Sequence, residues 1–127
     1  MSVHTILVVA DEPITRNLIL HVLAGRGFRV YEADSETETE ILCHALGEGA
    51  FDLVIADHAV ATTTGQAVAE RVLALCPGVK ILQLSTLPFH EMQARGALLA
   101  GSAFLQRPFT TQQLMDAVES ALAPRTQ

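Results

Sequence analysis

The sequence predicts a single α/β domain in which a parallel β-sheet is covered by helices on both faces. Five short apolar runs alternate with five longer segments of helical character, and this alternation is typical of such a sheet. The first and third runs are continuously hydrophobic, as expected for central strands that are buried on both faces. The chain has 127 residues, half of them hydrophobic, which is enough for one core and too few for a second domain.

The strands are predicted from the apolar runs themselves. In the second run Arg29 stands between Phe28 and Val30, and this alternation of polar and apolar residues favours a strand at the edge of the sheet. The five predicted strands span residues 6–10, 28–31, 53–56, 81–84 and 103–105.

The helices are predicted from their start and stop signals. The first begins near Pro13 and ends near Gly25, because proline favours the first helical turn and glycine favours the position after the last. Candidate capping boxes, Ser35 with Glu38 and Thr110 with Gln113, precede the second and fifth helices. The remaining two helices are expected over about 65–75 and 89–100. The first two helices are expected to bury apolar stripes, formed by Ile14, Leu18, Val22 and Leu23 and by Ile41, Leu42 and Leu46.

The composition argues against several classes of function. With 8 basic and 14 acidic residues the formal net charge is −6, so the positive surface that nucleic-acid binding requires is not expected. No apolar stretch reaches the roughly eighteen residues of a membrane helix, and we expect a cytoplasmic protein. Cys43 and Cys76 lack Cys-x-x-Cys spacing, so we interpret both as small buried hydrophobic residues rather than a disulfide or metal ligands.

Polar residues follow four of the five predicted strands. The first strand is followed by Asp11 and Glu12, and the third by Asp57. In open α/β sheets ligands bind outside the carboxyl ends of the strands, so these side chains are expected to converge. Carboxylates suit Mg²⁺, whereas a hydroxyl and a guanidinium suit a phosphoryl group. The last two strands supply those groups, as Ser85 with Thr86 and as Arg107.

Each of these residues also has a structural interpretation. Asp11 could simply cap the first helix, because Asp and Glu ahead of a proline favour a helix start. Asp57 is separated from the next helix by residues 59–64, so a capping role would be poorly placed there. Asp57 is therefore the strongest candidate for a chemical role.

Three segments of the chain resemble the receiver domain of bacterial two-component response regulators. They are residues 6–13, residues 51–57 with Gly65 eight residues further on, and residues 101–109. The similarity runs from about residue 5 to residue 122. It implies a flavodoxin-like (βα)5 doubly wound sheet with strand order 2-1-3-4-5, in a receiver domain of residues 3–123 followed by a tail of residues 124–127.

The resemblance also implies roles for the residues at the strand ends. Asp57 matches the phosphoacceptor aspartate. Asp11, Asp57 and the backbone carbonyl of Ala59 match the ligands of the required Mg²⁺, and Glu12 is a further candidate ligand. Ser85 and Arg107 match the residues that contact the phosphoryl group.

A switch is implied at the same positions. Ser85 and Phe104 match the hydroxyl and the aromatic residue whose movements follow phosphorylation. The family pattern also predicts a cis peptide bond between Arg107 and Pro108. The fourth helix, fifth strand and fifth helix would form the output surface.

The implied partners are a histidine kinase or phosphotransfer protein and a downstream protein target, with no nucleic acid and no membrane contacted. The domain would be a monomer or weak homodimer. It would not be an enzyme beyond its own phosphorylation and dephosphorylation.

Two departures from the family pattern leave alternatives open. Ala10 stands where the family has a second acidic residue, and Arg107 stands where it has lysine. The chain is therefore either a phosphorylated receiver with weakened metal dependence or a degenerate receiver that binds partners without phosphorylation. A flavin carrier is a less favoured alternative, because two acidic residues and Pro13 follow the first strand, where a phosphate loop would need amide donors. A phosphatase of the haloacid-dehalogenase type is also less favoured, because Pro13 stands where it would need a second Asp.

Overall fold

A computed structural model describes residues 3–60 and 63–123. Its main sheet has five parallel strands in the order β2-β1-β3-β6-β7, which confirms the predicted order 2-1-3-4-5. These strands are β1 (Thr5–Val9), β2 (Arg29–Ala33), β3 (Leu53–Asp57), β6 (Lys80–Ser85) and β7 (Ala103–Gln106). A short antiparallel pair, β4 (Ala59–Val60) and β5 (Thr63–Thr64), follows β3 and was not predicted. The proposed tail, residues 124–127, lies outside the described residues.

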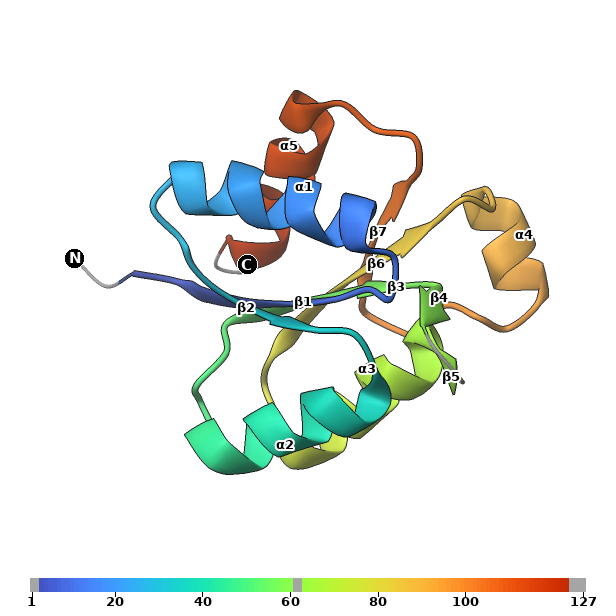
Figure 1. Cartoon of the computed structure of the whole chain (residues 1–127). Helices are drawn as coiled ribbons and strands as arrows, with labels where there is room; N and C mark the ends of the chain where they lie inside the picture. Colours follow the sequence, from blue (N-terminus) through green and yellow to red (C-terminus); the bar gives the residue numbers. More distant parts are fainter. Residues whose placement is uncertain (1–2, 61–62, 124–127) are drawn as a thin grey trace.

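Helices cover both faces of the sheet, as Figure 1 shows. On one face lie α1 (Pro13–Gly25) and α5 (Thr111–Leu122), and on the other lie α2 (Glu36–Leu46) and α3 (Gly65–Leu75). The short helix α4 (Phe89–Ala94) follows the carboxyl end of β6 and stands to the side of these layers.

Each face of the sheet has its own hydrophobic core because side chains alternate along a strand. From β1, Ile6 and Val8 pack with the α1 and α5 side chains. Leu7 and Val9 pack with the α2 and α3 side chains. Cys43 and Cys76 belong to the second core as buried free thiols, as predicted.

The buried faces of the first two helices differ from the predicted stripes. In α1 Leu23 is buried as expected, but Ile14 is 79% exposed and Leu18 is 51% exposed, and Ile19 is buried in their place. In α2 the buried residues are Thr39 and Cys43, whereas Ile41 and Leu46 are exposed. Both helices carry apolar residues on two sides, and contact with the sheet decided which side is buried.

The fourth helix is shorter than predicted, ending at Ala94 rather than near residue 100. Gly96 adopts a φ of 67°, a left-handed conformation that ends a helix. The segment that follows is held by the buried amide of Gln83. Its Nε2 donates to the Ala97 carbonyl at 3.0 Å, and its Oε1 accepts from the Leu99 backbone N–H at 2.7 Å.

The two predicted capping boxes have different outcomes. The box of Thr110 and Gln113 is complete, with both reciprocal hydrogen bonds present. Ser35 accepts from the backbone N–H of Glu38, but the Glu38 carboxylate accepts from the Asp34 N–H. The capping box of Ser35 and Glu38 is therefore only half formed.

Candidate functional site

The centre of the site is Asp57, the last residue of β3. Parallel pairing sets it opposite Leu84 of β6, so that it lies where the central strands end. The residue is only 1% exposed. A buried carboxylate requires partners that compensate the loss of water, and the groups around Asp57 supply them.

Gly65, the first residue of α3, packs directly against the backbone of Asp57. Its N–H donates to the His58 carbonyl at 2.9 Å. A Cβ atom at this position would lie 2.1 Å from the Asp57 carbonyl oxygen, which is far inside contact distance. Only glycine therefore lets α3 begin so close to the end of β3.

Arg107 forms an ion pair with Asp57 in which Nη2 lies 3.2 Å from Oδ1. The Arg107 side chain is 19% exposed, so the pair is largely shielded from water. Its backbone N–H donates to the Ser85 carbonyl at 2.7 Å, which ties it to the end of β6. The peptide bond between Arg107 and Pro108 is cis, as predicted.

The Arg107 guanidinium has a second anchor on α1 that the sequence did not reveal. Its Nη1 donates to Thr15 Oγ1 at 3.2 Å, and the Thr15 hydroxyl donates to Glu12 Oε1 at 3.1 Å. Glu12, considered above as a candidate metal ligand, is thus engaged with Thr15 and exposed to solvent. No pattern in the sequence links Thr15 to a residue 92 positions away.

A second guanidinium, that of Arg16, lies at the end of β1 and was also missed. Its Nη1 donates to the Ala10 carbonyl at 2.7 Å, and its Nε lies 3.3 Å from Glu32 Oε1. The Arg16 side chain is 15% exposed and that of Glu32 is 54% exposed. The strand end that lacks the expected acid therefore carries a largely buried positive charge.

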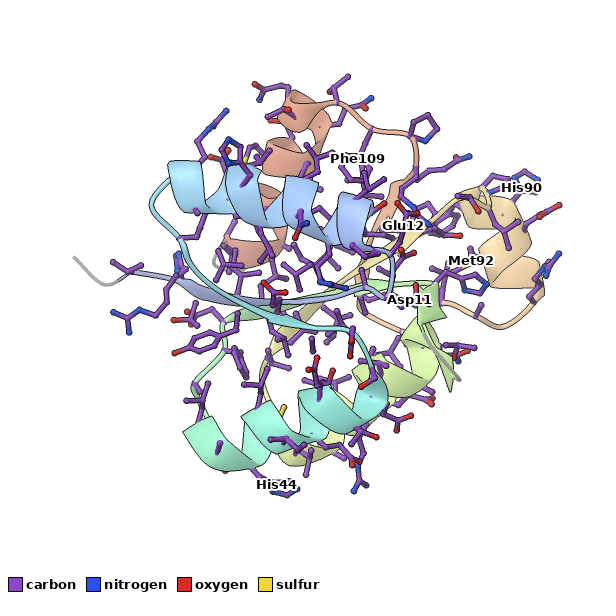
Figure 2. The ribbon with its side chains drawn as sticks, viewed as in Figure 1. Asp11, Glu12, His44, His90, Met92 and Phe109 are labelled. Atoms are coloured by element: carbon purple, nitrogen blue, oxygen red, sulfur yellow. The ribbon has the colours of Figure 1, made fainter. Side chains whose placement is uncertain are left out.

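The expected metal ligands lie at the end of β1, at the end of β3 and in β4. Asp11 is exposed and lies with Glu12 at the start of α1 (Figure 2). Ala59 lies in β4 and pairs with Thr64. Within residues 3–60 and 63–123, no group of three or more His, Cys, Asp or Glu side chains could hold a metal ion.

The two predicted switch residues occupy different surroundings. Ser85 is fully buried, and its Oγ accepts from the Leu87 backbone N–H at 2.8 Å. Phe104 is half-buried and packs edge-on against Phe89 of α4, with ring centroids 5.6 Å apart. The aromatic residue is therefore linked to the short helix that follows Ser85.

Comparison with known proteins identifies the family. The sequence model of the response regulator receiver domain matches residues 6–119, which is most of the chain. This chain belongs to the response regulator receiver family. The assignment does not favour the flavin-carrier and phosphatase alternatives.

Similar proteins agree with this assignment. The receiver is 26% identical over 126 residues to the DNA-binding transcriptional regulator NtrC of Azospirillum brasilense, covering 99% of this chain and 26% of that protein. It is 28% identical over 118 residues to the sensor kinase CckA of Brucella abortus, covering 93% of this chain and 12% of that protein. The chain thus spans only a minor part of each relative. The crystal structure of a response regulator receiver protein from Sinorhizobium medicae is 26% identical, with a TM-score of 0.80 and 95% of both chains covered.

A groove of about 410 Å³ lies beside the ion pair of the receiver. Its lining comes from the start of α1 and from the loops after β6 and β7, namely Glu12, Thr15, Leu18, Thr86, Arg107, Pro108 and Phe109. A molecule in this groove would meet Arg107 directly.

In the described part of the chain, no helix combines the length and apolar character needed to cross a bilayer.

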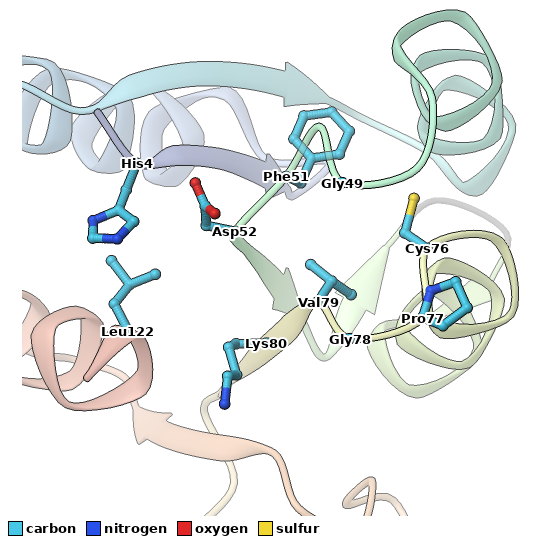
Figure 3. Close-up of a pocket in the computed structure, with 10 residues that line it drawn as sticks. All are labelled: His4, Gly49, Phe51, Asp52, Cys76, Pro77, Gly78, Val79, Lys80 and Leu122. Carbon is cyan, nitrogen blue, oxygen red and sulfur yellow. The ribbon is translucent and has the colours of Figure 1, made fainter. Parts of the chain in front are cut away.

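Another cavity, of about 280 Å³, lies at the opposite edge of the sheet (Figure 3). It is lined by Asp52, the residue before β3, together with His4 and Lys80 among others. The Asp52 carboxylate accepts from the Thr5 backbone N–H at 2.8 Å, which gives it a structural role. This cavity is remote from Asp57 because the two aspartates lie at opposite ends of one strand.

Proposed function

We propose that Asp57 accepts a phosphoryl group from a histidine kinase or phosphotransfer protein. The observation that supports this proposal is the buried ion pair between Asp57 and Arg107 beside an open groove. A carboxylate that attacks a phosphoryl group needs a nearby cation to offset the charge of the incoming oxygens. Arg107 supplies such a cation at 3.2 Å.

Receiver domains typically bind Mg²⁺, but the residues of this chain fit that ion poorly. Asp11, Asp57 and the Ala59 carbonyl remain as donors. Ala10 supplies no carboxylate, and the Arg16 guanidinium is bound to the Ala10 carbonyl instead. Loss of one supporting group around a metal typically costs about 10 to 100-fold in affinity, so we assign no step of the reaction to a metal.

The signal would leave through Ser85, Phe104 and the surface formed by α4, β7 and α5. The Ser85 hydroxyl accepts from the Leu87 N–H, and its own O–H can donate to new phosphoryl oxygens at Asp57. A shift of Phe104 would then be passed to Phe89 of α4 through their ring contact. A downstream protein that binds this surface in one of its two arrangements would read the signal, and we propose that this occurs in the cytoplasm.

The proposal is tested by incubating the protein with acetyl phosphate and measuring its intact mass. The wild type is expected to gain one phosphoryl group, and Asp57→Asn is expected to gain none. Asp52→Asn is the matched control, because Asp52 lies before the same strand and its Asn amide oxygen can still accept from Thr5. An unmodified wild type would favour the degenerate, binding-only receiver. Modification of Asp57→Asn would contradict the assigned acceptor.

A further inference from the structure

A positively charged side chain, that of Arg107, already lies beside Asp57. We propose that this site accepts a phosphoryl group without a divalent metal, with Arg107 as the resident cation and Thr15 as the residue that positions it. The inference rests on the proposed acceptor role of Asp57. It goes further by naming which group neutralises the reaction and which residue holds that group in place.

Arg107 is fixed at two points rather than one. Nη2 pairs with Asp57 at 3.2 Å, while Nη1 donates to Thr15 Oγ1 at 3.2 Å. Thr15 is itself oriented by its hydrogen bond to Glu12. A planar guanidinium held by two of its nitrogens is pre-organised in a way that an ammonium on a flexible stem is not. Its charge is therefore already in position before any substrate arrives.

The Arg107 guanidinium still has a hydrogen-bond donor that a substrate could use. Its Nε is buried and has no hydrogen-bond partner within the described residues. A buried N–H without an acceptor is costly, and guanidinium nitrogens match phosphoryl oxygens in geometry. An oxygen of an incoming phosphoryl group would satisfy this donor.

The charges at the neighbouring strand end disfavour a metal. Ala10 removes one carboxylate, and Arg16 sets a guanidinium on the Ala10 carbonyl. Its partner Glu32 is about half exposed, so water screens that acid more than it screens the buried arginine. A dication bound at Asp57 would be repelled by both Arg107 and Arg16.

The proposed step is a simple displacement on phosphorus. An Asp57 carboxylate oxygen forms a bond to the phosphorus of an acyl phosphate. The bond from phosphorus to the bridging oxygen breaks, and its electron pair leaves on the carboxylate of the acid released. No proton is transferred and no oxidant or reductant is needed.

The first test compares acetyl phosphate labelling of the wild type in excess EDTA and in Mg²⁺, followed by intact mass. We expect the two rates to agree within about threefold, because removing metal removes no group on which this site depends. Labelling that falls more than about tenfold in EDTA would overturn the inference and leave the acceptor role of Asp57 intact. Absence of labelling in both buffers would overturn both.

The second test asks whether Thr15 positions Arg107. Thr15→Val removes the hydroxyl at nearly constant volume, and we expect the rate in EDTA to fall about tenfold, as for loss of a supporting group. Thr15→Ser keeps the hydroxyl and is expected to restore the rate. Circular dichroism of each variant gives its folded fraction, by which the rate is corrected. A corrected rate in Thr15→Val equal to that of the wild type would contradict the role.

The third test measures metal binding itself by calorimetric titration of Mg²⁺. The wild type is expected to bind weakly, and the double variant Ala10→Asp with Arg107→Lys to bind about 10 to 100-fold more tightly, since a carboxylate is added and the rigid fork removed. The double variant should also lose its labelling in EDTA. Equal Mg²⁺ affinity in the two proteins would contradict the inference that the charges around Asp57 disfavour a metal ion.

Discussion

Replacing Gly65 by alanine tests how closely the site depends on the contact between α3 and β3. The added Cβ would lie 2.1 Å from the Asp57 carbonyl oxygen and 2.8 Å from its carbonyl carbon. Carbon and oxygen normally approach no closer than roughly 3.3 Å, so the two backbones must separate by about 1.2 Å. Overpacking of this kind typically costs about 1–3 kcal/mol, and we expect the upper half of that range because both partners are backbone.

The same displacement should impair phosphorylation of Asp57. A shift of about 1 Å at a reacting group can cost roughly 100-fold in rate. Urea unfolding followed by circular dichroism gives the change in the free energy of unfolding, and intact mass after acetyl phosphate treatment gives the rate. Both quantities should fall together, because one movement causes both.

Gly25→Ala is the matched control for this prediction. Gly25 ends α1, and a Cβ there would meet nothing within 4 Å. Alanine is the better helix former by up to about 1 kcal/mol, so this variant should be as stable as the wild type or more so. If Gly65→Ala loses no more stability than Gly25→Ala, α3 does not approach the backbone of Asp57 as closely as described.

Two further predictions concern buried polar groups. Gln83→Leu removes the amide that satisfies the Ala97 carbonyl and the Leu99 N–H, so the free energy of unfolding should fall by about 2–3 kcal/mol. Hydrogen exchange of the Leu99 amide should also become faster, and an unchanged exchange rate would count against this network. Burial, with a smaller effect of the neighbouring Cys76, raises the pKa of the Cys43 thiol from 9.0 to about 12. Above pH 9 the unfolded chain releases this proton while the folded chain keeps it, so stability should decline from pH 9 towards pH 12, and the decline should be smaller in Cys43→Ala. Equal declines in the two proteins would contradict the shift.

Much of the site could be predicted because its key residues follow apolar runs. Asp57 ends a continuous hydrophobic strand, and the end of such a strand is fixed by local sequence. The cis bond before Pro108 and the capping box at Thr110 are likewise local features. The prediction for the fourth helix ran too far, to about residue 100, because Gly96 ends the helix near Ala94. The segment that follows is held by Gln83, a residue on a neighbouring strand that no local pattern reveals.

The sequence by itself determined the edge position of β2 and the placing of Asp57 at the carboxyl edge, because both follow from periodicity and chain order. The strand order was implied by the resemblance of three sequence segments to the receiver family. Only the tertiary structure decided which face of α1 is buried. That choice turns Arg16 towards Ala10 and Thr15 towards Arg107. Such contacts join residues far apart in the chain, and no local pattern records them. The physical reason is that packing of the whole helix on the sheet, rather than the preference of any one residue, sets its rotation.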